Sequence, residues 1–112
     1  MNVSIENTEG GVSVASAHGR LDFGASAEFQ KALEGAVAAK PKALVIECSA
    51  LEYVSSAGLR AFLVAARAAK AGNVGFAACG LQPAVKEVFE VSGFSKIIDV
   101  QADLAAALAA LA

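Results

Sequence analysis

The stretch ALVIECSALEYVSSAGLRAFLVAARAAKAG, residues 43–72, decides the fold class. It opens on a short apolar run, residues 43–48, whose valine and isoleucine content is typical of a buried strand. Ser55 and Ser56 then precede a helical pattern that Gly72 is placed to end. The apolar positions of this pattern recur at i, i+3, i+4 and i+7, and they are Leu59, Phe62, Leu63 and Ala66. A buried strand that leads into an amphipathic helix is the repeating unit of an α/β fold.

Strand and helix patterns alternate on both sides of this stretch. The predicted strands are residues 3–6, 12–17, 43–48, 74–79 and 96–100. The other predicted helical faces carry Phe29, Leu33, Ala36 and Val37, then Val85, Val88 and Phe89, and finally Leu104, Leu108 and Leu111. The order β-β-α-β-α-β-α-β-α predicts one α/β domain over residues 1–112, with a mixed, mostly parallel sheet of about five strands and about four helices. The first two strands are expected to form an antiparallel hairpin at one edge.

Composition argues against several classes of function. The 112 residues carry a formal net charge of −2, so nothing gives a broad attraction to nucleic acid or to an anionic membrane. The apolar runs are too short to span a bilayer, and the first residues lack the pattern of a signal peptide, so we expect a cytoplasmic protein. Cys48 and Cys79 both sit in apolar, strand-like stretches, which predicts buried, reduced thiols.

Signatures of catalysis are absent from the sequence. His18 is the single histidine, and it lies in a strand-like stretch with no cue for a nucleophile beside it. No cluster of cysteine, histidine and carboxylate has metal-ligand spacing, and no glycine-rich loop matches a nucleotide fingerprint. A carboxylate pair for acid–base chemistry stays open, although nothing points to one. We therefore expect a binding module without a cofactor or a metal, not an enzyme.

The strand-to-helix junction holds the candidate site. The segment Tyr53-Val54-Ser55-Ser56-Ala57-Gly58-Leu59-Arg60 follows a buried strand, so it should lie at the carboxyl edge of the sheet, where binding sites gather. One interpretation of Ser55 and Ser56 is structural, because a serine hydroxyl there can accept a hydrogen bond from a free backbone N–H group of the helix. The other interpretation is a functional hydroxyl.

The helix after the junction offers a second candidate feature. Arg60, Val64 and Arg67 recur at i, i+4 and i+7, opposite the apolar stripe. They form either a solvated face or a docking surface beside Ser56.

Five short motifs resemble those of the STAS family, the anti-sigma factor antagonists of bacterial partner-switching systems. Ser55-Ser56-Ala57-Gly58-Leu59 is similar to its Asp-Ser-Ser/Thr-Gly-Leu signature, and Gly19-Arg20-Leu21-Asp22 is similar to its Gly-x-Leu-Asp. The others are Pro83-Ala84-Val85, Val91-Ser92-Gly93-Phe94 and Lys96-Ile97-Ile98. Each motif is weak alone, but together they occur in order along essentially the whole chain.

The resemblance implies an anti-sigma factor antagonist that regulates transcription by protein binding. Its partners would be an anti-sigma factor that is also a serine kinase of the GHKL type, and a matching phosphatase. The phosphorylated serine of the family falls on Ser56. The implied partner-binding residues are Asp22, Ser55, Ser56, Ala57, Gly58, Arg60 and Val64. For Asp22, a helix-start residue favoured by the helix dipole is the equal alternative.

The sequence departs from the family pattern at two positions. Ser55 stands where the family has aspartate, which makes the loop less negative and Ser55 a possible second phosphoacceptor. Ala57 stands where many members have serine or threonine.

Two other functions remain as alternatives. One is a STAS subunit of a transporter-associated or stressosome-like complex, which would dock without a phosphorylation switch. The other is a small enzyme.

Overall fold

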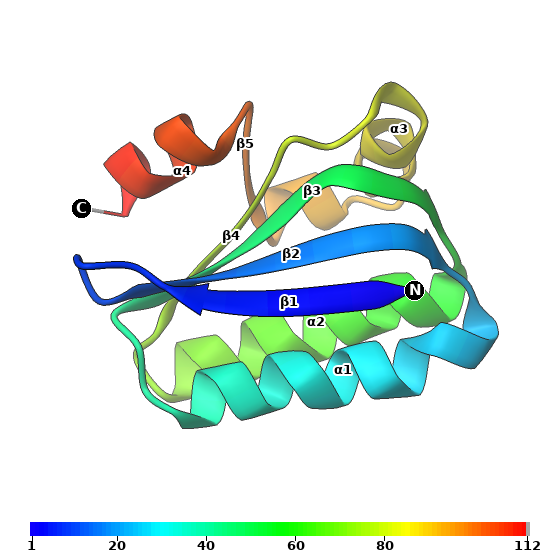
Figure 1. Ribbon diagram of the computed structural model, residues 1–112. Helices are drawn as coiled ribbons and strands as arrows, with labels where there is room; N and C mark the ends of the chain where they lie inside the picture. The colour runs from blue at the N-terminus through cyan, green and yellow to red at the C-terminus, as the bar shows by residue number, and fades with distance from the viewer. Residues whose placement is uncertain (112) are drawn as a thin grey trace.

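The computed structural model describes residues 1–111, which form one sheet with helices on both faces (Figure 1). In chain order the elements are β1 (Asn2–Asn7), β2 (Val12–Leu21), α1 (Phe23–Ala38), β3 (Ala43–Val54), α2 (Ser56–Ala71), β4 (Gly75–Cys79), α3 (Pro83–Val91), the 3-10 helix η1 (Phe94–Lys96), β5 (Asp99–Gln101) and α4 (Leu104–Ala110). The five strands lie in the order β1-β2-β3-β4-β5. β1 is antiparallel to β2, and all other neighbours are parallel. The predicted fold class and edge hairpin are confirmed.

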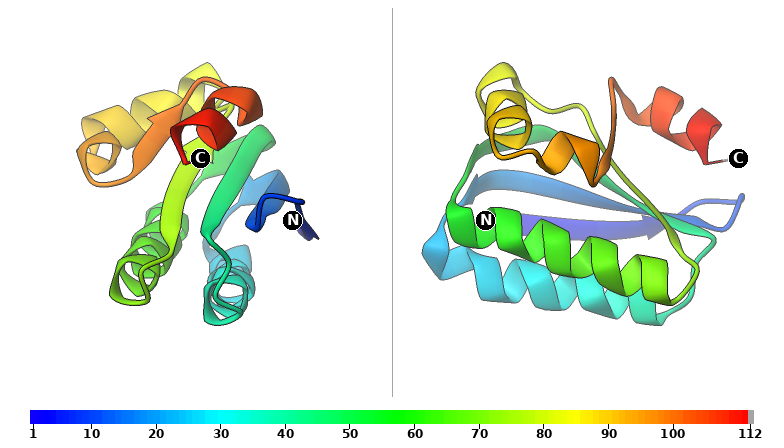
Figure 2. Two further views of the ribbon diagram at one scale, coloured as in Figure 1. Left: turned by 90° about the vertical axis from the view of Figure 1, so that its left-hand side faces the viewer. Right: turned by 180° about the vertical axis from the view of Figure 1, so that it is seen from behind.

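The helices form a layer on each side of the sheet. α1 and α2 run side by side on one face (Figures 1 and 2). α3 packs with them, because its buried Val85 and Phe89 belong to the same core cluster as Phe62 of α2, whereas α4 packs on the other face. A row of phenylalanine rings ties three of the helices together, because Phe62 of α2 lies 5.2 Å from Phe29 of α1 and 5.2 Å from Phe89 of α3, measured between ring centroids. The leucine face of α4 covers a smaller cluster made by Val12, Ala43, Val45, Cys79 and Ala107.

The parallel pairing of β2 and β3 positions the candidate site. Both strands end at the same edge of the sheet, where Leu21 pairs with Val54. The next helices, α1 and α2, therefore begin side by side at that edge (Figure 1). Asp22 and Ser55 are the N-cap residues of these two helices.

The predicted strand at residues 96–100 is wrong in most of its length. Gly93 adopts a left-handed conformation with φ of 81°, and the chain then makes the turn of η1 before β5 starts at Asp99. The amide of Ile98 donates to the Phe94 carbonyl at 2.8 Å, which buries Ile98 and leaves Ile97 60% exposed. Two adjacent isoleucines imitate a strand in sequence, but here they lie in a turn.

Strand ends and one helix face also differ from the prediction, and β2 continues to Leu21 instead of ending at residue 17. β3 continues to Val54 instead of ending at Cys48, because it stays paired with β2 through two register shifts even where its side chains become polar. The apolar stripe of α2 is also displaced: Leu63 is half-buried and lies outside the core. The residues of α2 that are buried are Gly58, Leu59, Ala61, Phe62, Ala65 and Ala69.

Candidate functional site

The two motifs at the carboxyl edge are joined by a backbone hydrogen bond. The amide of Ser55 donates to the carbonyl oxygen of Leu21 at 2.8 Å, directly beyond the last paired residues of β2 and β3. This bond holds the two strand-to-helix junctions side by side. One junction carries Asp22 and the other carries Ser56.

Gly58 allows α2 to start this close to β2. A Cβ atom at position 58 would lie 2.6 Å from Cγ of Leu21 and 3.0 Å from its carbonyl oxygen. Leu21 is fully buried, so its side chain has little room to move aside. The glycine of the Ser-Ser-Ala-Gly-Leu segment is thus a close-approach position that fixes where Ser56 stands.

The structure separates the roles of the two serines. Ser55 is half-buried, and its Oγ accepts a hydrogen bond from the Gly58 amide at 3.1 Å, so Ser55 caps α2. Ser56 is the first residue of α2, it is exposed, and its hydroxyl has no hydrogen-bond partner among residues 1–111. The structural interpretation, open for both serines from sequence, holds for Ser55 and leaves the Ser56 hydroxyl available for chemistry.

Asp22 caps the neighbouring helix. Its Oδ1 accepts from the Ala25 amide at 2.9 Å, which confirms the helix-start interpretation; contact with a partner stays a prediction. Phe23 follows it with 81% of its surface exposed. Sequence reasoning missed Phe23, although helical geometry places it roughly 120° around α1 from the buried Phe29.

A shallow hollow of about 440 Å³ opens beside Ser56. It is lined by Ser56, Ala57, Leu59, Arg60, Leu63 and Phe94, and we call it the Ser56 hollow. Leu63, misassigned to the core from sequence, and Phe94 of η1 supply apolar surface here. Arg60 is exposed at its rim, while Val64 is half-buried and Arg67 lies exposed further along α2.

Arg60 is the one charged residue among those that line this hollow. Residues 53–86 contain Arg60, Arg67, Lys70 and Lys86 and no aspartate or glutamate, in a chain whose net charge is −2. Arg20, at the end of β2, lies with its guanidinium carbon 4.4 Å from the centroid of the Tyr53 ring.

The two cysteines are not suited to catalysis. Both are free and buried, as the sequence predicts. Burial raises the pKa of the Cys79 thiol to about 11, and the nearby Glu47 carboxylate adds to this shift. Burial likewise raises the pKa of Cys48. Both thiols therefore stay protonated at neutral pH, and a thiolate is the form that attacks or binds metal. His18 lies exposed on β2.

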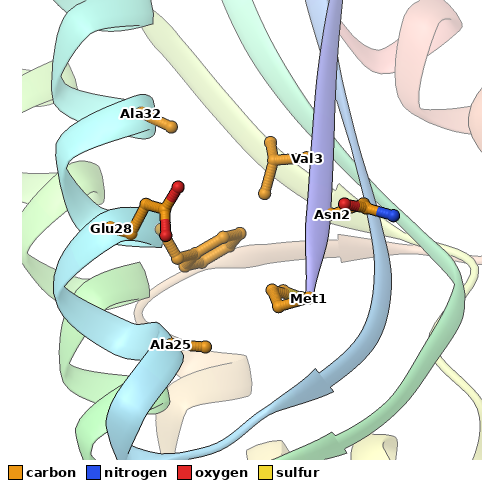
Figure 3. Close-up of a pocket in the computed structure, with 7 residues that line it drawn as sticks. Met1, Asn2, Val3, Ala25, Glu28 and Ala32 are labelled. Carbon is orange, nitrogen blue, oxygen red and sulfur yellow. The ribbon is translucent and has the colours of Figure 1, made fainter.

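A second hollow, of about 200 Å³, lies away from these motifs between the start of β1 and α1 (Figure 3). Figure 3 shows Val3 and Met1 turned toward Ala25 and Ala32 of α1, with Asn2 turned away. Among the residues that line this hollow, Glu28 alone has a charged side chain. Over residues 1–111, no group of three or more histidine, cysteine, aspartate or glutamate side chains is arranged to hold a metal ion.

Comparison with known proteins agrees with this geometry. Residues 4–107 match the STAS domain family. The chain belongs to the STAS family. A protein of Bordetella bronchiseptica named as an anti-sigma factor antagonist, BtrV, is 33% identical over 100 residues, covering 89% of this chain and 86% of that protein. The anti-sigma-F factor antagonist RsfB of Mycobacterium tuberculosis is 40% identical over 63 residues, or 56% of this chain and 50% of RsfB.

Solved structures show the same STAS architecture. The crystal structure of an anti-sigma factor antagonist from Mycobacterium paratuberculosis superposes with a TM-score of 0.87 at 28% identity, covering 98% of this chain and 92% of that one. Within residues 1–111, no helix has the length and apolar character needed to cross a membrane.

Proposed function

We propose that this protein is an anti-sigma factor antagonist that binds an anti-sigma factor with serine kinase activity and is released when Ser56 is phosphorylated. One observation carries the proposal: Ser56 presents an exposed, unengaged hydroxyl at the first residue of α2, beside an apolar hollow with a cationic rim. The likeness to relatives named as anti-sigma factor antagonists supports it.

The geometry favours Ser56 over Ser55 as the phosphoacceptor. A kinase that modified Ser55 would have to take its Oγ out of the capping hydrogen bond with Gly58. Loss of such a cap costs about 1 kcal/mol. Ser56 has no such bond to lose. Ser55 also explains how the chain does without the aspartate of the family pattern, because serine and aspartate cap helices about equally well.

Phosphorylation would switch the interface and leave the fold intact. A phosphoserine carries a charge of about −1.5 to −2 at neutral pH. At the start of a helix, the free N–H groups and the dipole favour an anion, so α2 need not unfold. Pressed against an apolar or acidic partner surface, the same phosphate would have to lose water where the partner offers it no cation, at a cost of several kcal/mol. Even about 3 kcal/mol corresponds to roughly a hundredfold loss of affinity.

The partner surface would combine an apolar centre with an acidic rim. Leu63 and Phe94 offer the apolar contact in the Ser56 hollow. Phe23, exposed at the first residue of α1, adds apolar surface at the same edge of the sheet. Arg60 offers the charge, because its guanidinium can bind a carboxylate through two parallel hydrogen bonds. We expect the protein to act in the cytoplasm by binding alone. A GHKL-type kinase would phosphorylate it and end the binding, and a phosphatase would remove the phosphate and allow binding again.

The test is phosphorylation by the kinase that co-purifies with the protein. Incubation with ATP, followed by peptide mass spectrometry, should place the phosphate on Ser56, and Ser56→Ala should abolish it. Ser55→Ala is the matched control and should still be phosphorylated. Modification of Ser55 alone, or of a residue outside the Ser56 hollow, would overturn the proposal.

A further inference from the structure

We propose that Arg60 becomes the internal counter-ion of the phosphate on Ser56, so that phosphorylation also withdraws Arg60 from the partner. This inference rests on the proposed function, because it concerns the regulation of the same site. It adds a second effect of the phosphate: a negative charge appears on the Ser56 hollow, and the cation that faced the partner is neutralised.

Helix geometry brings the two side chains together. Ser56 and Arg60 are four residues apart in α2, which places their Cβ atoms about 5–6 Å from each other on one face. Side chains of a helix lean toward its N-terminus, so the long side chain of Arg60 extends over the turn that holds Ser56. Both residues are exposed and both line the Ser56 hollow.

The chain offers Arg60 no acidic alternative nearby on α2. Residues 53–86 contain no aspartate or glutamate, so no carboxylate one turn away on the helix competes for the guanidinium. Arginine binds phosphate with two parallel hydrogen bonds, and this pairing is stronger than that of neutral groups. The new phosphate would therefore be the nearest anion to Arg60 along the helix.

The other cations of this region are less well placed. The guanidinium of Arg20 is stacked on Tyr53, with 4.4 Å between its central carbon and the ring centroid. Arg67 shares the exposed face of α2, but it stands eleven residues from Ser56, about 16 Å along the helix axis. Arg67 is thus a matched control: the same residue type on the same helix, beyond reach of the phosphate.

The pairing has a consequence for binding. With Ser56 unmodified, Arg60 is free to bind a carboxylate of the partner. With Ser56 phosphorylated, the same guanidinium is held by the phosphate. A substitution of Arg60 should therefore weaken partner binding in the unmodified protein and change it far less in the phosphorylated one.

The test needs no partner and no kinase. The full chain is produced with phosphoserine encoded at position 56, and the second ionisation of the phosphate, with a pKa of about 6, is followed by phosphorus NMR. A cation beside the phosphate stabilises its dianion, so Arg60→Gln should raise this pKa by about 0.3. Arg67→Gln should leave it unchanged, Arg60→Lys should keep part of the effect, and about 1 M salt should shrink the difference.

The kinase assay tests the proposed function, and the phosphate titration tests the pairing of Arg60 with the phosphate, so each can fail without the other. If the co-purifying kinase leaves Ser56 unmodified, the proposed function falls while the titration can still reveal the pair. If Ser56 is the phosphoacceptor but Arg60→Gln and Arg67→Gln titrate like the unsubstituted protein, Arg60 is not the counter-ion and this inference is overturned.

Discussion

The Gly58→Ala substitution probes the contact that joins the two motifs of the site. An added Cβ atom would stand 2.6 Å from Cγ of Leu21 and 3.0 Å from its carbonyl oxygen. Leu21 is fully buried, and that oxygen already accepts the Ser55 amide at 2.8 Å, so neither atom can yield freely. Overpacking of this kind lowers the free energy of unfolding by about 1–3 kcal/mol, and the higher helix propensity of alanine offsets at most about 1 kcal/mol of this loss.

The expected net loss in the free energy of unfolding is about 1–2 kcal/mol. For a domain of this size it should lower Tm by roughly 5–10 °C in a thermal unfolding experiment. Gly35→Ala is the matched control, because Gly35 lies exposed in α1 and a Cβ there meets no other atom within 4 Å. That variant should gain about 0.5–1 kcal/mol. A Gly58→Ala protein as stable as the unsubstituted chain would refute the reasoning.

Four other outcomes follow from the site. Ser55→Ala should lower the free energy of unfolding by about 1 kcal/mol and Ser56→Ala by less than about 0.5 kcal/mol, because only the first removes a helix cap; the reverse order in thermal unfolding would contradict the assignment. Arg60→Glu should weaken partner binding roughly tenfold or more in a calorimetric titration, and Arg67→Glu should matter less; equal effects would mean that the contact does not centre on Ser56. Phe23→Ala should weaken partner binding without lowering Tm, since 81% of the residue's surface is already exposed, and an unchanged affinity would place the partner elsewhere. The two buried thiols, whose pKa values burial raises, should react with a thiol reagent at pH 8 only after the protein is unfolded, so rapid labelling of the native chain would argue against their burial.

Several features of the site follow from local sequence. The apolar run that opens β3 and the helical pattern that follows Ser56 predict a strand-to-helix junction, and parallel pairing places such a junction at the carboxyl edge of a sheet. Gly72 ends α2 as predicted. These features depend on neighbours along the chain, so spacing and residue type are enough to reveal them.

Which serine caps α2 and which has an exposed hydroxyl depended on tertiary structure. Both residues are equally plausible caps in sequence, and the choice depends on where α2 begins. That start is set by the contact of Gly58 with Leu21, two residues that are far apart along the chain. The hydrogen bond from the Ser55 amide to the Leu21 carbonyl then holds Ser55 at the cap and leaves Ser56 exposed.

The sequence by itself determined the order of the elements, the mostly parallel sheet and the junction at Ser56, because periodicity and turn chemistry are local. Only the tertiary structure decided which apolar side chains are covered. Leu63 continues the helical stripe and Ile97 looks like part of a strand, yet both stay outside the core. Whether an apolar residue is buried depends on what packs over it. Leu63 of α2 stays half-buried and lines the Ser56 hollow together with Phe94 of η1.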